Sequence, residues 1–218
     1  MRTKWIPCMI FAGALAVPLS SVIAGTAAQE TKRTDEKPKV FAVGSTVPES
    51  LALPDFAADM TSFKDLRGKV TIVHFWSDRC PAERHANPVF MEMEKRFADN
   101  KDVVMIGIAA NQNELGAVPA KDADRSKTYP NLRKKMKEVG YKHKMLVDHG
   151  NKVSTLFGAR STPHCFVIDK KGVIQYAGAL DDDPRGSKGK EATNYLVDAT
   201  AAILKGEAPK VTSTKPYG

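Results

Sequence analysis

Cysteine is scarce in this chain. Three cysteines occur in 218 residues, and no two of them form a Cys-x-x-Cys pair. Their small number excludes the dense disulfide framework of small secreted domains, and the paired motifs that signal a zinc site are missing. A chain of this length can bury a stable core without such links. We therefore expect at least one of Cys80 and Cys165 to be present for its chemistry, since Cys8 lies in the leader described below.

The chain also lacks low-complexity tracts, internal repeats and any zinc-finger, helix-turn-helix or aromatic RNA-binding signature. Its composition, 42% hydrophobic and 27% charged, is typical of one folded domain. The net charge is +8, or +6 (31 basic against 25 acidic residues) without the two basic residues of the leader. The lysines are scattered among acidic and apolar positions, so we expect a solvated basic surface and no nucleic-acid partner.

The first residues predict export. Two basic residues precede an uncharged stretch, residues 5–28, and small side chains follow its apolar part. This order of basic, apolar and small residues is typical of a signal peptide over residues 1–28, with cleavage after Ala24 or Ala28. The stretch is also long enough to stay uncleaved as a membrane tether through residues 5–24. In both cases we expect the working domain outside the cytoplasm, in the periplasm or an equivalent compartment.

Composition then divides the remainder into three parts. Residues 29–40 are polar and charged without periodicity, which is typical of a linker. The apolar patterns lie between residues 41 and 206, where we expect the folded domain, and residues 207–218 form a C-terminal tail.

Strand and helix patterns alternate and predict an α/β fold. Residues 70–76, VTIVHFW, form a nearly continuous β-branched and aromatic run, as in a central strand buried on both faces. A helical spacing of apolar residues follows Pro81, and the run at 103–108 repeats the buried-strand pattern, which predicts a strand–helix–strand crossover. We further expect an N-terminal strand or extended arm at 51–56, a turn and short helix at 60–69, helices at 131–139, 152–157 and 191–204, and strands at 145–148, 165–169 and 173–176.

Cys80 follows the first buried strand, where the predicted helix begins. Pro81 suits the first helical position because its missing N–H would have no partner there, which makes Cys80 the expected N-cap. The dipole and free N–H groups of a helix N-terminus favour a negative sulfur. A reactive thiolate is therefore our interpretation, and an inert capping cysteine is the alternative.

Two other polar residues near this junction have a structural and a functional interpretation. Glu83 can reach back to the N-cap amide as in a capping box, or it can handle a proton beside Cys80 or orient an arginine. His74 lies inside the strand, and we interpret it as a packed core histidine. Further along, Pro163 stands directly before a buried strand, where an X-Pro bond can be cis.

These motifs together resemble the redoxin branch of the thioredoxin-like superfamily, which holds the peroxiredoxins (AhpC/TSA type) and exported thioredoxin-like reductases. The resemblance covers residues 44–206 and rests on SDRCPAE at 77–83, on Pro88, on Thr-Pro at 162–163 and on FVIDKKG at 166–172. It implies a thioredoxin-like fold, in which helices flank a central mixed β-sheet.

The resemblance also implies an activity. Many peroxiredoxins carry Thr/Ser-x-x-Cys-Pro-x-Glu, which Ser77 and the residues up to Glu83 satisfy. In the reductases the like-placed motif is Cys-x-x-Cys, and here Glu83 stands where the second cysteine would be. Pro163 resembles the cis-proline that packs beside the nucleophile in thioredoxins. The implied protein is an exported thiol oxidoreductase with antioxidant activity, whose Cys80 thiolate reduces a peroxide or exchanges with a protein disulfide, is restored by an external thiol and needs no cofactor.

The second cysteine of the domain leaves two interpretations open. Cys165 lies two residues past Pro163, so it shares a strand face with that residue and could resolve oxidised Cys80. A buried core cysteine is the alternative. The distant active-site arginine of peroxiredoxins has no clear counterpart, and Arg160 is the candidate for it.

Two other function classes compete with the oxidoreductase. Cys80, His164 and Cys165, with His85, could serve as soft ligands for copper or zinc. The protein could also be a redox-inactive accessory on the same fold. The acidic run at 181–183 is interpreted as a solvated turn before a proline and not as a calcium loop, because the further acids that such a loop needs are missing.

Overall fold

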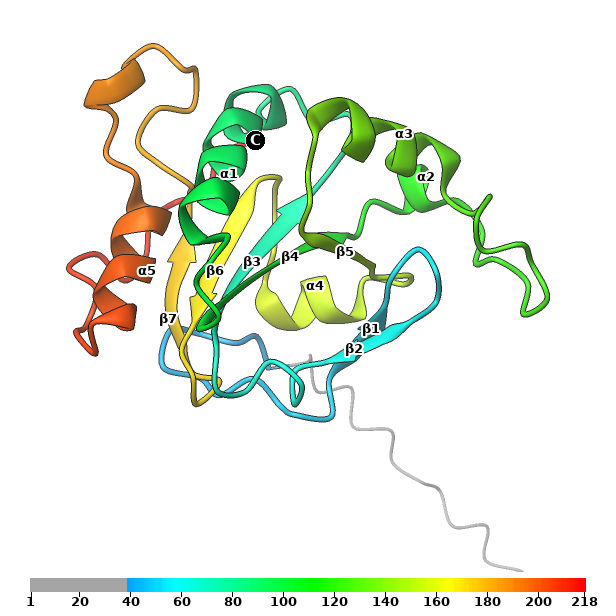
Figure 1. The fold of residues 1–218 in the computed structure, drawn as a ribbon, viewed down its shortest axis with the longest axis horizontal. Coiled ribbons are helices and arrows are strands. Elements are labelled where there is room, and N and C mark those ends of the chain that lie inside the picture. The colour runs from blue at the N-terminus through cyan, green and yellow to red at the C-terminus, as the bar shows by residue number, and fades with distance from the viewer. Residues whose placement is uncertain (1–38) are drawn as a thin grey trace, which may run out of the picture. The chain divides into compact units, whose positions relative to one another are not determined.

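A five-stranded sheet forms the centre of the chain (Figure 1). The computed structural model describes residues 39–218, so the predicted leader, its cleavage positions, Cys8 and most of the linker lie outside the described residues. The strands of the sheet are β3 (Val70–Trp76), β4 (Val103–Ala109), β5 (Lys144–Val147), β6 (His164–Ile168) and β7 (Ile174–Gly178).

The sheet is mixed, and β3 is its middle strand. The spatial order is β5-β4-β3-β6-β7, in which β3, β4 and β5 run parallel while β6 is antiparallel to both β3 and β7. All seven residues of β3 are buried, as the continuous apolar run predicts. The expected α/β fold with a thioredoxin-like mixed sheet and flanking helices is confirmed.

Each face of the sheet is covered by its own hydrophobic core. Helices α1 (Glu83–Phe97), α3 (Pro130–Val139) and α5 (Tyr195–Leu204) pack on one face, and α4 (Lys152–Phe157) packs on the other. Successive residues of a strand point to opposite faces, so Ile72 and Trp76 join the first core whereas Phe75 joins the second. The neighbour of Phe75, His74, therefore faces α1.

Residues 60–69 do not contain the expected short helix. Met60–Ser62 form strand β2, which pairs antiparallel with β1 (Ala52–Pro54). The carboxylate of Asp55 accepts hydrogen bonds from two backbone N–H groups in the intervening turn, those of Ala57 (2.8 Å) and Asp59 (3.0 Å). This local closure favours a hairpin, because the aspartate side chain replaces backbone partners that a helix would supply.

The last helix begins later than its pattern predicts. A 3-10 turn, Gly189–Glu191, precedes it, and α5 starts at Tyr195 because the Asn194 side chain accepts the N–H of Val197 at 2.9 Å. A further short helix, α2 (Gln112–Leu115), follows β4.

The tail after α5 packs on the domain. Ser213 forms a parallel bridge with Ala177 of β7, where the Ala177 N–H donates to Thr212 (3.1 Å) and the Thr214 N–H donates back to Ala177 (3.2 Å). The division into a domain at 41–206 and a separate tail stays a prediction. Within residues 39–218, no helix has the length and hydropathy needed to cross a bilayer.

Candidate functional site

Three loops converge at the carboxyl end of β3. Trp76 is in register with Ala109, so the loops that follow the parallel strands β3 and β4 lie side by side. Phe75 is in register with His164, and the antiparallel pairing brings the start of β6 to the same edge. The Cys80 loop, the α2 segment and the residues before β6 therefore meet although they are far apart in sequence.

Cys80 is half-buried in this convergence, and its thiol donates to the carbonyl oxygen of Thr162 at 2.8 Å. The Thr162–Pro163 bond is cis, and Pro163 is buried. The nucleophile expected from the sequence and the expected cis-proline thus lie next to each other.

Cys80 is not the N-cap of α1, contrary to expectation. The helix begins at Glu83 with Ala82 as its N-cap, and Pro81 lies in a preceding turn. The Glu83 N–H donates to the Cys80 carbonyl at 3.2 Å, which closes a tight turn of three-residue spacing. Cys80 is therefore one turn ahead of the regular helix.

Glu83 points into the protein, which overturns the capping-box interpretation. Both of its carboxyl oxygens lie within 3.1–3.2 Å of His74 Nε2, and the two side chains are almost fully buried. The His74 ring stacks on Phe90 with a centroid separation of 3.8 Å. His74 is packed in the core as predicted, but it also has a polar partner that the sequence pattern did not reveal.

Burial determines the charge state of this pair. It raises the pKa of the Glu83 carboxyl well above its usual value and lowers the pKa of the His74 imidazole to about 3. Both shifts favour the uncharged forms of the two groups, in which a protonated Glu83 carboxyl donates to His74 Nε2. Within residues 39–218, the remaining ring nitrogen, His74 Nδ1, has no hydrogen-bond partner.

Ser77 contacts α2. Its hydroxyl donates to Glu114 Oε1 at 2.5 Å, and the Asp78 N–H donates to the other carboxyl oxygen at 3.0 Å. Asn111 adds a third donor to Glu114 at 2.8 Å. Glu114 thus fixes the loop that carries Cys80. The sequence analysis did not identify Glu114. Its position could have indicated it, because Glu114 follows β4, which is the parallel neighbour of β3.

A cavity of about 300 Å³ opens beside the thiol. Cys80 and Glu83 both line it. Three cationic side chains, those of Arg79, Arg84 and Lys135, also line it and surround the sulfur side of the cavity with positive charge. The complete lining is Trp76, Ser77, Asp78, Arg79, Cys80, Glu83, Arg84, Asn87 and Lys135.

Cys165 and His164 point to opposite faces of the sheet. Cys165 is fully buried in the core that contains α1, and burial raises the pKa of its thiol well above the usual value. The ring of His164 stacks on Phe166 at 4.6 Å, on the other face. Burial, and after it the charge of Arg160, lowers the pKa of His164 to about 4. Arg160 itself is exposed, three residues ahead of the cis-proline.

The copper or zinc ligand set is not assembled. The opposite orientation of His164 and Cys165 prevents both from meeting Cys80 at one ion, and His85 packs against Gly186. Across the described part of the chain, no three His, Cys, Asp or Glu side chains are grouped to hold a metal.

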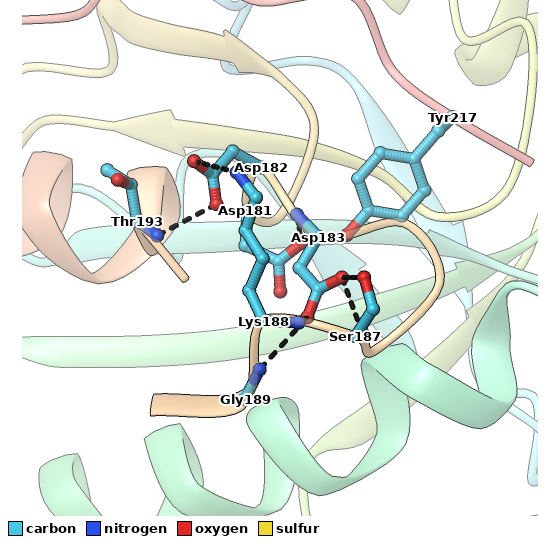
Figure 2. A network of polar contacts seen from close by, with 8 residues as sticks. All are labelled: Asp181, Asp182, Asp183, Ser187, Lys188, Gly189, Thr193 and Tyr217. Atoms are coloured by element: carbon cyan, nitrogen blue, oxygen red, sulfur yellow. Dashed lines mark hydrogen bonds and ion pairs between the residues drawn. The ribbon is translucent and has the colours of Figure 1, made fainter. Parts of the chain in front are cut away.

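The acidic run at 181–183 is not the solvated turn that was expected (Figure 2). Asp181 and Asp183 are buried. Asp183 accepts the backbone N–H groups of Ser187 (2.7 Å), Lys188 (2.7 Å) and Gly189 (3.2 Å). These carboxylates bind protein donors, because the chain folds back over them at residues 187–189.

Comparison with known proteins gives a family match. Residues 43–177 match the model of the AhpC/TSA family. The chain is 24% identical over 134 residues to the thioredoxin-like protein YneN of Bacillus subtilis (strain 168), covering 59% of this chain and 70% of that protein. It is 24% identical over 132 residues to the thiol-disulfide oxidoreductase ResA of Bacillus thuringiensis (strain Al Hakam), covering 61% of this chain and 66%, just under two thirds, of that protein.

Solved structures show the same fold. A hypothetical protein from Sinorhizobium meliloti 1021 superposes with a TM-score of 0.64 at 23% identity, over 82% of this chain and 94% of that one. An uncharacterized conserved protein from Geobacillus kaustophilus gives a TM-score of 0.64 at 22% identity, over 82% and 95%. The long coverage indicates that the likeness extends beyond the central sheet.

Proposed function

Since the chain belongs to the AhpC/TSA family, we propose that it is a thiol–disulfide oxidoreductase whose nucleophile is Cys80. One observation carries the proposal. The half-buried Cys80 thiol lies against the carbonyl of Thr162, beside a cis-proline and at the edge of a cavity that Glu83 also lines. A reactive sulfur, a backbone edge for a partner and a proton source thus share one space.

The reaction follows from these groups. The Cys80 thiolate attacks one sulfur of a substrate disulfide, forms a mixed disulfide with it and expels the other sulfur as a thiolate. Glu83, which is hydrogen-bonded to His74, lines the cavity into which that thiolate leaves, and its carboxyl group protonates the leaving sulfur. A second thiol then attacks the mixed disulfide, which releases Cys80 and leaves the substrate sulfur joined to the new thiol.

The second thiol comes from outside the domain. Glu83 occupies the position of a second motif cysteine, and Cys165 is a fully buried, protonated thiol in the core. Such a thiol is a poor nucleophile. We therefore assign the resolving role to an external thiol. Because the leader predicts export, we place this chemistry outside the cytoplasm, with the membrane tether through residues 5–24 as the alternative to a cleaved signal.

Peroxide reduction is the second candidate. It is favoured by the Ser77-to-Glu83 motif and by the cationic lining of the cavity, which attracts an anionic sulfur and polar oxidants. In this reaction the Cys80 thiolate takes one oxygen from the peroxide and becomes a sulfenic acid, and water or an alcohol leaves. Two external thiols then reduce the sulfenic acid and become a disulfide.

Peptide mass spectrometry tests both candidates on the full chain. After incubation with glutathione disulfide, we expect a glutathione adduct on Cys80 that added thiol removes. Cys80→Ser abolishes it, and the matched control Cys165→Ala retains it. A separate sample with limiting peroxide and a sulfenic-acid trap reports the second candidate. Absence of any Cys80 adduct contradicts the proposal, and stoichiometric copper or zinc on such an unreactive protein favours metal binding instead.

A further inference from the structure

The segment after α5 ends at the nucleophile. Gly218 lies so close to Thr162 that a Cβ placed on it would be 2.0 Å from the Thr162 carbonyl oxygen and 2.8 Å from its carbon. This is the same oxygen that accepts the Cys80 thiol hydrogen. Cys80 and Gly218, which are far apart in the sequence, therefore both approach one backbone carbonyl.

The segment 214–218 is held there by specific contacts. The Thr214 hydroxyl accepts the N–H of Ala179 at 2.9 Å and lies 2.7 Å from the Tyr176 hydroxyl. The Tyr217 hydroxyl donates to the carboxylate of Asp181. Extended backbone pairing with β7 at Ser213 leads into these contacts. These contacts hold the segment beside the end of β7.

Asp181 is a prepared acceptor for this tyrosine (Figure 2). Its exposed fraction is 8%, and its other hydrogen bond comes from the Asp183 N–H at 3.0 Å. The loop that holds it is closed by Asp183 and by Asp182, which pairs with Lys188 at 2.8 Å. The acidic loop therefore presents one carboxylate to an aromatic hydroxyl, beside a hollow of about 590 Å³ that residues 214–218 line.

Thr162 and Asp181 form the surface on which residues 214–218 lie, which we call the seat. This seat has the properties of a peptide-binding site. Within residues 39–218, neither the N–H nor the C=O of Thr162 takes part in a backbone–backbone hydrogen bond. An unpaired backbone edge next to a strand recognises an extended peptide by main-chain contacts, and side-chain pockets add selectivity. Here Asp181 selects a side chain with a hydroxylated ring. The close approach to Thr162 selects glycine at the next position, because a Cβ there would clash.

We propose that residues 214–218 occupy, within the same chain, the seat on which the disulfide-bearing segment of a protein substrate docks before it reacts with Cys80. The seat accepts an extended segment in which a tyrosine is followed by glycine. This inference rests on the proposed function of Cys80. Small disulfides reach the sulfur with the segment in place, whereas a protein substrate reacts only after the segment has left, so its apparent affinity falls with the fraction of open molecules.

Cysteine alkylation tests the seat without requiring disulfide exchange. The full-length chain is treated with iodoacetamide or with a long polyethylene-glycol maleimide, and the rate at Cys80 is read by peptide mass spectrometry. Tyr217→Phe removes the hydroxyl contact with Asp181, and Gly218→Ala introduces the clash with Thr162. Lys210→Ala is the matched control, an exposed change in the same tail.

We expect both seat variants to raise the rate with the large reagent by about tenfold, while iodoacetamide reacts unchanged. Tyr217→Phe loses one hydrogen bond to a carboxylate, and Gly218→Ala places a Cβ against the Thr162 carbonyl. Lys210→Ala changes neither rate. A free peptide with the sequence of residues 213–218, STKPYG, restores protection to Tyr217→Phe. Equal rates of the large reagent in native and Tyr217→Phe protein overturn the inference. Glutathione adducts on Cys80 report the proposed function separately, so the two failures are distinguishable.

Discussion

At the scale of single residues, the proposed chemistry of Cys80 depends on the Glu83–His74 pair. Two ionisable groups that share a buried hydrogen bond stay neutral when both charges would be desolvated, and Glu83 lines the same cavity as Cys80. Glu83 stands at the sequence position of a second motif cysteine, so the proposed reaction has a proton donor there in place of a second thiol.

This neutral pair predicts how stability varies with pH. Burial raises the pKa of Glu83 above its usual value of 4.5, so the folded chain keeps a proton that the unfolded chain releases. Relative to Glu83→Gln, the free energy of unfolding of the native chain therefore falls as pH rises above 4.5, with a slope of at most about 1.4 kcal/mol per pH unit. Urea unfolding curves across this range measure the difference. A native free energy of unfolding that rises with pH relative to Glu83→Gln would instead show an ionised Glu83 in the folded chain.

The same substitution tests the proton donor. Glutamine keeps the size of Glu83 and can hydrogen-bond His74, but it has no proton to give to a leaving thiolate. We expect Glu83→Gln to slow the reaction of Cys80 with glutathione disulfide by about 10-fold to 100-fold. An activated aromatic disulfide needs no protonation of its leaving group, so its rate stays near native. Equal slowing with both reagents would indicate a structural role.

Residue types in the motif were predictable, whereas their partners were not. The strand, the turn residues and the family pattern identify Cys80 and Pro163, because these positions have local signatures. The pairing of Glu83 with His74 depends on how α1 rotates over β3, and periodicity does not resolve which of two neighbouring faces a first-turn residue occupies. A functional interpretation of Glu83 was therefore possible from the sequence, but His74 could not be identified as its partner.

At the scale of elements, strand order assembles the site. The parallel β3–β4 pair brings Glu114 to the Cys80 loop, and the antiparallel β3–β6 pair brings Thr162 to the same edge. Helix α4 and the strands at 70–76 and 164–168 follow their sequence patterns closely. Strand β1 lies within the strand or extended arm expected at 51–56, whereas β2 escaped prediction because three residues are too few for an alternating pattern to register.

The contacts of Glu114 make an energetic prediction. Glu114→Ala removes the two hydrogen bonds from Ser77 and Asp78 of the Cys80 loop and a third from Asn111, the N-cap of α2. We expect a loss of about 1 to 3 kcal/mol in the free energy of unfolding and faster amide exchange at Asp78. Glu92→Ala, an exposed change on α1, serves as the control with an effect below about 0.5 kcal/mol. Identical losses in the two variants would contradict this role of Glu114.

At the scale of the whole molecule, the two hydrophobic cores enclose β3 on both faces, while Cys80 stays partly exposed at the end of that strand. The tail contributes to this edge, although its sequence is polar and carries no periodicity. Its position depends on single contacts, such as that of Tyr217 with Asp181, which no local pattern reports. This explains why the sheet was predictable and the return of the tail to Thr162 was not.

The central claim is that the fold makes Cys80 a nucleophile for disulfides. The most direct measurement is the rate of glutathione adduct formation at Cys80 in the folded chain and in the same chain unfolded in urea, read by peptide mass spectrometry. The unfolded chain keeps the residue but loses Glu83, His74 and the cationic cavity around it. We predict that folded Cys80 reacts at least about tenfold faster than unfolded Cys80. A folded rate equal to or below the unfolded rate would contradict the account.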